Sequence, residues 1–298
     1  MLEPRQYRHG LPCPGPDPWI EPASFSVPEG ACDCHAHVID DGSRFPLSAE
    51  RSYTPPPASE RDYLAMLDAT GMTYGVLVQV SVHGLDNRFM LEVLARHPER
   101  LRGVAVIDDS FSPSTLAAMH ELGVRGTRVN VLFGGGVALD QLETLATLIA
   151  PYGWHLQLLV GAEQLPSLLP RLVRLQTPLV IDHMGHPAAA AGVESEGFRA
   201  LCRLIGDHGH WVKLSAPYRL EPEHDDYAAS RTMARRLAAI APERVLYGSD
   251  WPHVAIPYQR PNTGHMRNLV GEWFDDAQIQ RLLVSNPATL YGFGSDAG

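Results

Sequence analysis

Two histidines and an aspartate occupy alternating positions near the start of the chain, in the segment Asp33-Cys34-His35-Ala36-His37. Side chains of an extended strand alternate between its two faces, so this spacing predicts that all three point the same way. Two imidazoles at such a spacing can chelate one cation, or they can hydrogen-bond to an oxygen of a bound substrate. The segment therefore indicates a reacting centre, with a pair of packed structural histidines as the alternative.

Two further candidates follow short apolar runs later in the chain, His183 after residues 179–181 and Asp250 after residues 245–248. A carboxylate among imidazoles can bind a metal, or it can take a proton from a water that attacks a carbonyl. The alternatives are a hydrogen-bonded structural histidine and an aspartate that only caps a helix. We expect one centre built from four catalytic side chains, which could also hold a single Zn²⁺: His35, His37, His183 and Asp250.

These residues need a framework that brings distant segments together, and the apolar pattern predicts one. Short apolar runs alternate with amphipathic stretches, which is typical of parallel strands joined by crossover helices. We expect strands at 31–38, 74–80, 101–107, 124–130, 155–160, 179–183, 211–215 and 245–249, and helices at 60–69, 88–96, 114–122, 139–150, 165–175, 198–207, 227–240 and 275–283. Eight such units favour an α/β fold, a single (β/α)8 TIM barrel with its chemistry at the C-terminal ends of the strands. No Gly-x-Gly-x-x-Gly motif opens the first helix, so a dinucleotide site lacks support.

Composition limits the class of protein. Residues 1–30 are rich in proline and glycine and show no periodicity, so we expect an extended N-terminal arm over a barrel domain of residues 31–298. The net charge of −10 argues against a nucleic-acid partner, and no apolar run approaches the length of a membrane helix. Four cysteines without a C-x-x-C pair, and an N-terminal sequence unlike a signal peptide, favour a cytoplasmic location. A homo-oligomer is compatible with these features.

Four motifs together carry a family resemblance: Asp33-x-His35-x-His37, Asp182-His183-Met184-Gly185, Gly248-Ser249-Asp250-Trp251-Pro252-His253 and Asn286-Pro287-x-x-x-Tyr291. They resemble the amidohydrolase superfamily, in the lactonase branch that contains the 2-pyrone-4,6-dicarboxylate lactonases, over about residues 31–293. The resemblance implies a hydrolase that opens a carboxylated lactone of the pyrone dicarboxylate, sugar-acid or muconolactone type, with no required cofactor. A metal-dependent decarboxylase or C–N hydrolase of the same superfamily is the alternative.

The resemblance also implies a substrate pocket. Family positions that hold substrate carboxylates are matched by Tyr53, Ser81, Arg128 and Arg219, and the pocket could include His83 and His253, which lie just past the second and eighth strands. Two positions depart from the family, because an expected arginine is Gly134 and an expected tyrosine is Leu159. A charged hydrogen bond contributes about 1.5–3 kcal/mol. The pocket therefore favours a lactone with one acidic group, or with its second group near Arg125 or Arg260.

The metal chemistry and the only lysine raise separate questions. Binuclear members of the superfamily resemble one another in a bridging Lys or Glu on the fourth strand, where this chain offers Thr127, Arg128 and Asn130. A two-metal site therefore lacks support. Lys213 could form a Schiff base with a carbonyl substrate, but we favour an internal ion pair, for which Asp33 is the candidate partner.

Overall fold

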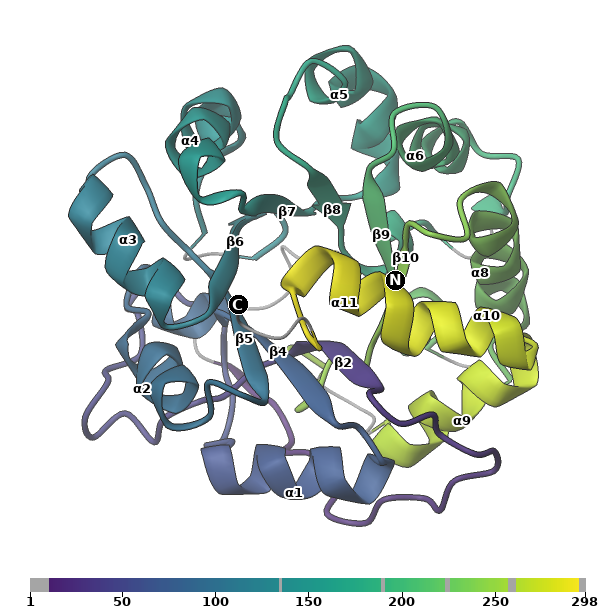
Figure 1. Ribbon diagram of the computed structural model, residues 1–298, viewed down its shortest axis with the longest axis horizontal. Helices are drawn as coiled ribbons and strands as arrows, with labels where there is room; N and C mark the ends of the chain where they lie inside the picture. The colour runs from purple at the N-terminus through teal and green to yellow at the C-terminus, as the bar shows by residue number, and fades with distance from the viewer. Residues whose placement is uncertain (1–10, 134–135, 189–190, 223–225, 257–260, 295–298) are drawn as a thin grey trace.

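The computed structural model describes residues 11–133, 136–188, 191–222, 226–256 and 261–294, and its centre is a parallel sheet (Figure 1). The eight-stranded sheet has the order β10-β9-β8-β7-β6-β5-β4-β2. The strands are β2 (Cys32–Ala36), β4 (Tyr74–Val78), β5 (Leu101–Ala105), β6 (Val124–Asn130), β7 (His155–Leu159), β8 (Leu179–Ile181), β9 (Trp211–Ser215) and β10 (Val245–Gly248). Each expected strand is present, and most end one or two residues earlier than the apolar runs suggested.

The first and last strands of this sheet meet just beyond β10, which closes the barrel. Ala36 forms a parallel bridge with Trp251. The Asp250 amide donates to His35 O at 2.8 Å, and the His37 amide donates to Trp251 O at 2.8 Å. The (β/α)8 prediction is therefore confirmed, and the seam between β2 and β10 joins two segments that carry candidate residues.

Helices surround the strands (Figure 1). They are α1 (Glu60–Thr70), α2 (Arg88–Arg96), α3 (Pro113–Glu121), α4 (Leu142–Ile149), α5 (Leu165–Leu172), α6 (Glu196–Gly206), α7 (Pro217–Leu220), α8 (Ala228–Ile240), α9 (Thr263–Trp273), α10 (Asp276–Gln280) and α11 (Asn286–Tyr291). Serine hydroxyls cap three of them, since Ser59, Ser112 and Ser195 each accept an amide of the first turn. The helix expected at 139–150 begins later, after a 3₁₀ turn at Leu139–Gln141.

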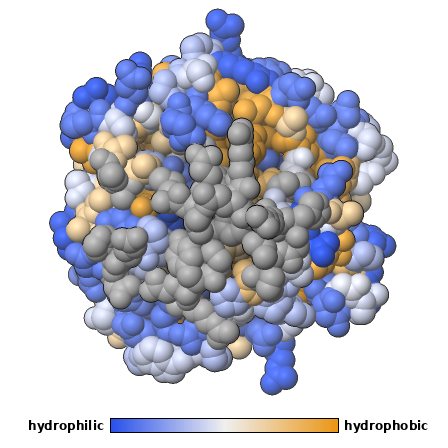
Figure 2. Space-filling view, turned by 180° about the vertical axis from the view of Figure 1, so that it is seen from behind, coloured by the Kyte–Doolittle hydropathy of each residue, from blue (hydrophilic) through white to orange (hydrophobic). Residues whose placement is uncertain are grey.

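The N-terminal end of the barrel is filled with apolar side chains. Cys32 and Trp211, which begin their strands, belong to one buried cluster with Tyr291 and Phe293. Phe293 stacks on Tyr74 with ring centroids 4.6 Å apart, and α11 crosses this end of the barrel in Figure 1. Figure 2 shows the opposite face, where the largest hydrophobic area lies above the centre and hydrophilic residues dominate the rim. The apolar filling of the N-terminal end leaves the C-terminal ends of the strands as the place for polar side chains.

Residues 11–30 run along the barrel domain. β1 (Leu11–Pro12) pairs in parallel with β3 (Tyr53–Thr54). Arg267 of α9 donates to Glu21 O at 2.7 Å, and a Cβ on Gly264 would lie only 2.3 Å from the same oxygen. These contacts attach residues 11–30 to the barrel, and the division into an arm and a barrel domain stays a prediction. Residues 1–10 of the expected arm and residues 295–298 of the expected barrel domain lie outside the described part. None of the described helices is both long and apolar enough to cross a membrane.

Candidate active site

The structure brings the four expected catalytic side chains together. Asp250 Oδ1 lies 3.6 Å from His35 Nε2, 3.7 Å from His37 Nε2 and 3.8 Å from His183 Nε2. All four side chains are buried. His35 lies near the end of β2 and His37 directly after it, while His183 and Asp250 each lie two residues beyond their strands. The centre therefore lies at the C-terminal ends of the strands.

A bulge in β2 determines which side chains of this segment point into the barrel. Between Asp33 and Ala36 the pairing with β4 shifts, so that three steps along β2 match two steps from Gly75 to Leu77. The expectation that Asp33 shares a face with the histidines is wrong, because its neighbours Cys32 and Cys34 belong to the cluster inside the barrel and Asp33 alternates with them. Its carboxylate accepts hydrogen bonds from the Ser249 amide at 2.8 Å and hydroxyl at 2.6 Å. His35 instead contacts groups across the barrel interior. The simple alternation of a strand does not hold through the bulge.

Unusual backbone angles position the other two candidates. His183 has φ 49° and Asp250 has φ 61°, both in the left-handed region that residues with side chains rarely adopt. Such conformations persist only where surrounding contacts enforce them, and they cluster at functional sites. Here the Asp250 amide is bound to His35 O, and Asp250 O accepts from the His253 amide at 2.7 Å. The turns after β8 and β10 therefore direct these side chains toward the imidazoles of β2.

Each histidine is held through Nδ1, so that its Nε2 faces the centre. His37 Nδ1 lies 2.7 Å from Val78 O, and His183 Nδ1 lies 2.8 Å from Ser215 Oγ. His35 Nδ1 lies 3.3 Å from Lys213 Nζ. Among the described residues, neither His35 Nε2 nor Asp250 Oδ1 has a hydrogen-bond partner. Buried polar atoms are rarely left unpaired, so this pair of atoms indicates a place for a ligand.

The second oxygen of Asp250 is held from the opposite side. Oδ2 accepts from Tyr218 OH at 2.5 Å and from Arg219 Nε at 2.8 Å. His253 Nδ1 lies 3.2 Å from Tyr218 OH, and its Nε2 lies 2.9 Å from Thr263 Oγ1. Arg219 and His253, which the sequence suggested as substrate ligands, therefore also orient Asp250, directly in one case and through Tyr218 in the other.

Burial and nearby charges shift the pKa values of the carboxyl group and the imidazoles at the centre. Burial opposes ionisation of Asp250, but Arg219 and His183 outweigh it and hold the pKa of this carboxyl well below its usual range. Burial lowers the pKa of His35 to about 3, and the charge of Lys213 acts in the same direction. Burial also places the pKa of His183 well below its usual value. At neutral pH the centre thus combines the ionised carboxylate of Asp250 with uncharged His35 and His183.

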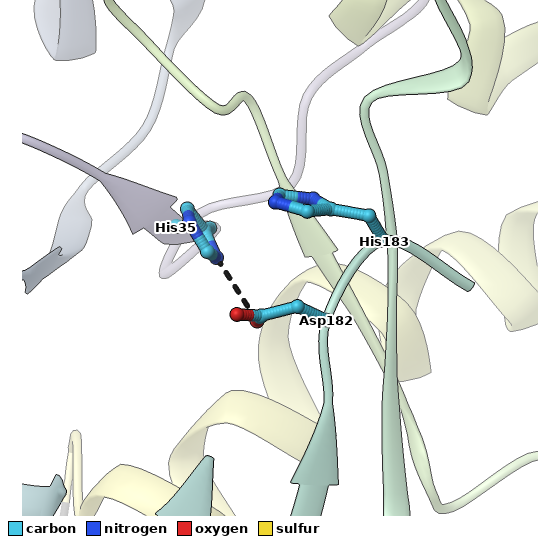
Figure 3. Close-up of side chains that lie close together, drawn as sticks. All are labelled: His35, Asp182 and His183. Carbon is cyan, nitrogen blue, oxygen red and sulfur yellow. Dashed lines mark ion pairs between the residues drawn. The ribbon is translucent and has the colours of Figure 1, made fainter. Parts of the chain in front are cut away.

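A buried polar network lies beneath the imidazoles. Asp182 Oδ2 accepts from Arg128 Nε at 3.0 Å and from Gln157 Nε2 at 3.1 Å. Asp182 Oδ1 lies 3.3 Å from His35 Nδ1, the contact drawn in Figure 3, and 3.8 Å from Lys213 Nζ. The carboxylate paired with Lys213 is therefore Asp182, and the suggested partner Asp33 is engaged with Ser249.

The remaining expected substrate residues form hydrogen bonds with groups other than the four. Tyr53 OH lies 3.2 Å from Ser81 Oγ, and both residues are buried. His83 Nε2 accepts from the Asp40 amide at 3.3 Å and lines a hollow of about 480 Å³ together with Asp108. No contact among the described residues joins this group directly to Asp250. These residues are consistent with a pocket wall rather than with the reacting centre.

Arg125 does not lie at the mouth of the barrel. It is near the start of β6, and its guanidinium donates to His120 O at 2.9 Å and Val124 O at 2.8 Å. The idea that Arg125 receives a second acidic group is therefore wrong. Gly134 and Arg260 lie outside the described residues. Leu159, at the end of β7, is buried and two residues from Gln157, so it occupies the interior face of that strand.

Several groups at the centre were given no role from the sequence. Ser215 and Tyr218 contact His183 and Asp250, respectively, and Asp182 appeared only as part of a motif. The ring of His186 lies 5.2 Å from that of His183. Ser215 shares a face with Lys213, two residues apart on the seventh barrel strand, and this spacing was the one signal available for it.

The four side chains also fit a single divalent cation. Ligand atoms about 2.0–2.2 Å from a tetrahedral ion lie somewhat more than 3 Å from one another. Asp250 Oδ1 lies 3.6–3.8 Å from the three Nε2 atoms, and His35, His37 and Asp250 form a group that could hold an ion. Their spacing suits Zn²⁺, on the condition that each Nε2 atom offers a lone pair to the ion.

Comparison with known proteins places this centre in a family. The model of the amidohydrolase family matches residues 32–293. The chain belongs to this family. Among curated amidohydrolase relatives, a 2-pyrone-4,6-dicarboxylate hydrolase from Comamonas testosteroni is 36% identical, over 90% of this chain and 92% of the relative. A 4-sulfomuconolactone hydrolase from Rhizobium radiobacter is 34% identical, over 94% of this chain and 96% of the relative.

A solved amidohydrolase structure agrees with these relatives. The crystal structure of a putative 2-pyrone-4,6-dicarboxylic acid hydrolase from Pseudomonas putida matches with a TM-score of 0.80 and 34% identity. The match covers 91% of this chain and 100% of that chain. The resemblance deduced from the motifs is thus confirmed at the level of the family and of the barrel.

Proposed function

We propose that this amidohydrolase is a hydrolase of cyclic carboxylic esters that opens an acidic lactone by adding water to the ring carbonyl. The observation that carries the proposal is Asp250 Oδ1, which has no hydrogen-bond partner in the described part of the chain and faces three imidazole Nε2 atoms within 3.8 Å. An ionised carboxylate in this position can take a proton from water. The relatives named for lactone hydrolysis support the same reaction class.

The reaction uses the two kinds of group in sequence. Asp250 removes a proton from water as the water oxygen bonds to the lactone carbonyl carbon. An imidazole that carries its proton on Nε2 stabilises the carbonyl oxygen as it gains charge, an effect worth about 3–4 kcal/mol for one well-placed donor. The ring C–O bond then breaks, and protonated Asp250 returns its proton to the departing oxygen. A positioned acid and base adds about 10²–10⁴-fold to the rate.

The cationic residues serve the base and the substrate. Arg219 keeps Asp250 ionised through the contact with Oδ2, and it lies at the edge of the centre with about 10% of its side chain exposed. Arg128 uses Nε for Asp182, and among the described residues its terminal amino groups have no hydrogen bond. We propose that a substrate carboxylate binds between these guanidiniums, with Tyr53, Ser81, His83 and His253 in supporting roles.

The identity of the lactone depends on the pocket wall. Leu159 presents an apolar side chain where the family resemblance led us to expect a phenol, and Gly134 replaces an expected arginine. A planar dicarboxylate would lack the hydrogen bonds that these two groups donate. Each hydrogen bond to a charged carboxylate contributes about 1.5–3 kcal/mol to binding. We propose a lactone with a single acidic group, of the muconolactone or sugar-acid type, as the preferred substrate.

A metal is a separate question from the reaction class. A single divalent ion held by His35, His37, His183 and Asp250 would supply Lewis-acid polarisation of the carbonyl oxygen. The scheme above requires none, because Asp250 is already ionised and an imidazole Nε2–H can serve as the donor to the carbonyl oxygen. A metal-dependent decarboxylase or C–N hydrolase would lose its activity when the ion is removed.

A turnover screen tests the proposal. The purified protein, with its metal content measured, is assayed against muconolactones, sugar lactones and 2-pyrone-4,6-dicarboxylate, before and after treatment with a chelator. We expect ring opening of a monoacidic lactone, a lower kcat/KM for the pyrone dicarboxylate, and activity that survives chelation. Release of carbon dioxide, or cleavage of amides but not lactones, would contradict the assignment.

A further inference from the structure

The chain has a single lysine, and it is completely buried beside the reacting centre. Lys213 lies in the middle of β9 with no solvent exposure. Its Nζ donates to Gln157 Oε1 at 2.7 Å and lies 3.3 Å from His35 Nδ1 and 3.8 Å from Asp182 Oδ1. An ammonium in the interior needs such partners, since a buried charge without them is costly. The scheme for lactone opening leaves this group without a role.

The contact with Lys213 bears on which nitrogen of His35 carries the proton, since Nδ1 lies 3.3 Å from Lys213 Nζ and 3.3 Å from Asp182 Oδ1. An ammonium has three donors and no acceptor, so a hydrogen bond between Lys213 Nζ and His35 Nδ1 requires a lone pair on Nδ1. The single proton of the neutral ring then lies on Nε2, the atom 3.6 Å from Asp250 Oδ1. His37 has the opposite arrangement, because Val78 O can only accept, which places the proton on Nδ1 and a lone pair on Nε2.

The surrounding network prevents Lys213 from pairing elsewhere. The amide of Gln157 is oriented by its own donation to Asp182 Oδ2, so its oxygen faces Lys213. Arg128 Nε also donates to Asp182 Oδ2. Lys213 therefore has one acceptor in Gln157, one distant charge partner in Asp182, and His35 as the remaining group within reach.

We propose that Lys213 is a positioning residue that holds His35 as an Nε2–H donor aimed at the reacting oxygen and so keeps the centre from binding a divalent cation. The proposal rests on the proposed lactone hydrolysis for its effect on rate, but the tautomer and the cation affinity are properties of the protein alone. A protonated Nε2 cannot be a metal ligand, whereas it suits an oxyanion. Nearby Lys213, Arg128 and Arg219 also make the centre a poor place for an added cation.

Removal of Lys213 should reverse this arrangement. His35 Nδ1 lies 3.3 Å from Asp182 Oδ1, which has no hydrogen-bond partner among the described residues. Without the ammonium, Nδ1–H can donate to that oxygen, and the lone pair moves to Nε2. His35 then joins His37 and Asp250 as a third ligand atom in the group that could hold an ion.

The wild-type protein allows a direct test. In protein labelled with ¹⁵N-histidine and stripped of metal, the nitrogen shifts of His35 are assigned by their loss in His35→Gln. We expect a protonated Nε2 and an unprotonated Nδ1 for His35. Because Lys213 is the only lysine, ¹⁵N-lysine labelling gives one Nζ signal, which should show a contact with the His35 ring. A protonated Nδ1 in the wild type would overturn the proposal, whatever the variants do.

Variants of Lys213 separate a positioning role from a merely structural one, because only a positioning role predicts a change in the His35 tautomer and in zinc affinity. In Lys213→Met we expect the His35 proton on Nδ1, an affinity for zinc chloride higher by about 10-fold or more, and a kcat lower by about 10-fold with little change in KM. Lys213→Arg keeps a donor and should retain the wild-type tautomer, and Arg199→Gln, at an exposed position of α6, is the matched control. A folded Lys213→Met with an unchanged tautomer and zinc affinity would refute the proposal. Absence of lactone turnover in the wild type would instead refute only the proposed function.

Discussion

Asp250 is held so that its two oxygens have different tasks. Oδ2 is occupied by Tyr218 and Arg219, while Oδ1 faces the imidazoles without a partner among the described residues. The first set of contacts keeps the carboxyl ionised, and the second leaves an oxygen for a water proton. Arg219 is therefore part of the base as much as of the substrate pocket, and replacing it should affect more than binding.

Replacement of Arg219 by glutamine should move the acid limb of the pH profile. Arg219 is the largest influence that lowers the pKa of Asp250, so its loss raises that pKa. The base is active only when ionised. On acidification, Arg219→Gln should therefore lose activity at a higher pH than the wild type does. The measurement is kcat/KM from pH 4 to pH 8 for the wild type, Arg219→Gln and the exposed control Arg199→Gln. An unchanged acid limb in Arg219→Gln would show that Asp250 does not depend on this contact.

The four central residues were predictable because their types and positions at strand ends signal chemistry. The groups that support them were not, because the signal depends on contacts between distant segments. Gln157 and Ser215 are ordinary strand residues until folding places them beside Lys213 and His183. Tyr218 follows β9 on a short helix, and only the fold brings its hydroxyl to Asp250.

The seam between β2 and β10 is closed by a side chain as well as by backbone. The carboxylate of Asp33 accepts from the amide and hydroxyl of Ser249 and from the His35 amide at 3.1 Å. One buried group thus ties together the segments that carry His35 and Asp250. The position of Asp33 in the motif reflects this link rather than a place among the reacting groups.

Replacement of Asp33 tests the strength of the seam. Asp33→Ala leaves two buried amides without an acceptor, and we expect a loss of about 2–4 kcal/mol in the free energy of unfolding. Asp33→Asn should lose less, since its amide oxygen can still accept from both amides. Denaturant unfolding compares these variants with Asp109→Ala, an exposed control. Equal stability of Asp33→Ala and the control would exclude a structural role for this carboxylate.

Strands and long helices followed from apolar periodicity, whereas irregular elements did not. The bulge in β2 is a feature of its pairing with β4, and the residues of β2 alone show only alternation. The turn at His183 and Met184 has left-handed backbone angles that neither residue type favours. β1 and β3 are two residues each, too short for a periodic signal. These elements depend on tertiary contacts, so local sequence could not reveal them.

The barrel as a whole encloses uncharged histidines, which links its stability to pH. Burial lowers the pKa to about 3 for His35, His155 and His186 and to about 4 for His210 and His253. The unfolded value is about 6.5. Unfolding therefore takes up protons below about pH 6.5, and the free energy of unfolding should fall as pH decreases from there. Asp33, whose pKa burial raises to about 6, acts in the opposite direction as one group against several.

Denaturant unfolding between pH 7 and pH 4.5 measures this dependence. We expect a slope that corresponds to more than one proton taken up on unfolding, since each such histidine adds about 1.4 kcal/mol per pH unit at most. His155 lies near the barrel floor beside Tyr291, away from the reacting centre, and both of its ring nitrogens lack hydrogen-bond partners among the described residues. His155→Leu should flatten the slope by up to one proton. Constant stability over this range would mean that the buried imidazoles are charged or accessible in the folded protein.

The most direct test of the whole account is whether Asp250→Asn binds and hydrolyses a lactone that the wild type hydrolyses. The amide keeps the size of the side chain but cannot accept a proton from water, so we predict that kcat falls by about 10²-fold or more while the lactone still binds with a similar Kd. Single-turnover kinetics and equilibrium binding on the metal-stripped protein separate these two quantities. Ring opening at the wild-type rate by folded Asp250→Asn would contradict the central claim that this carboxylate is the base.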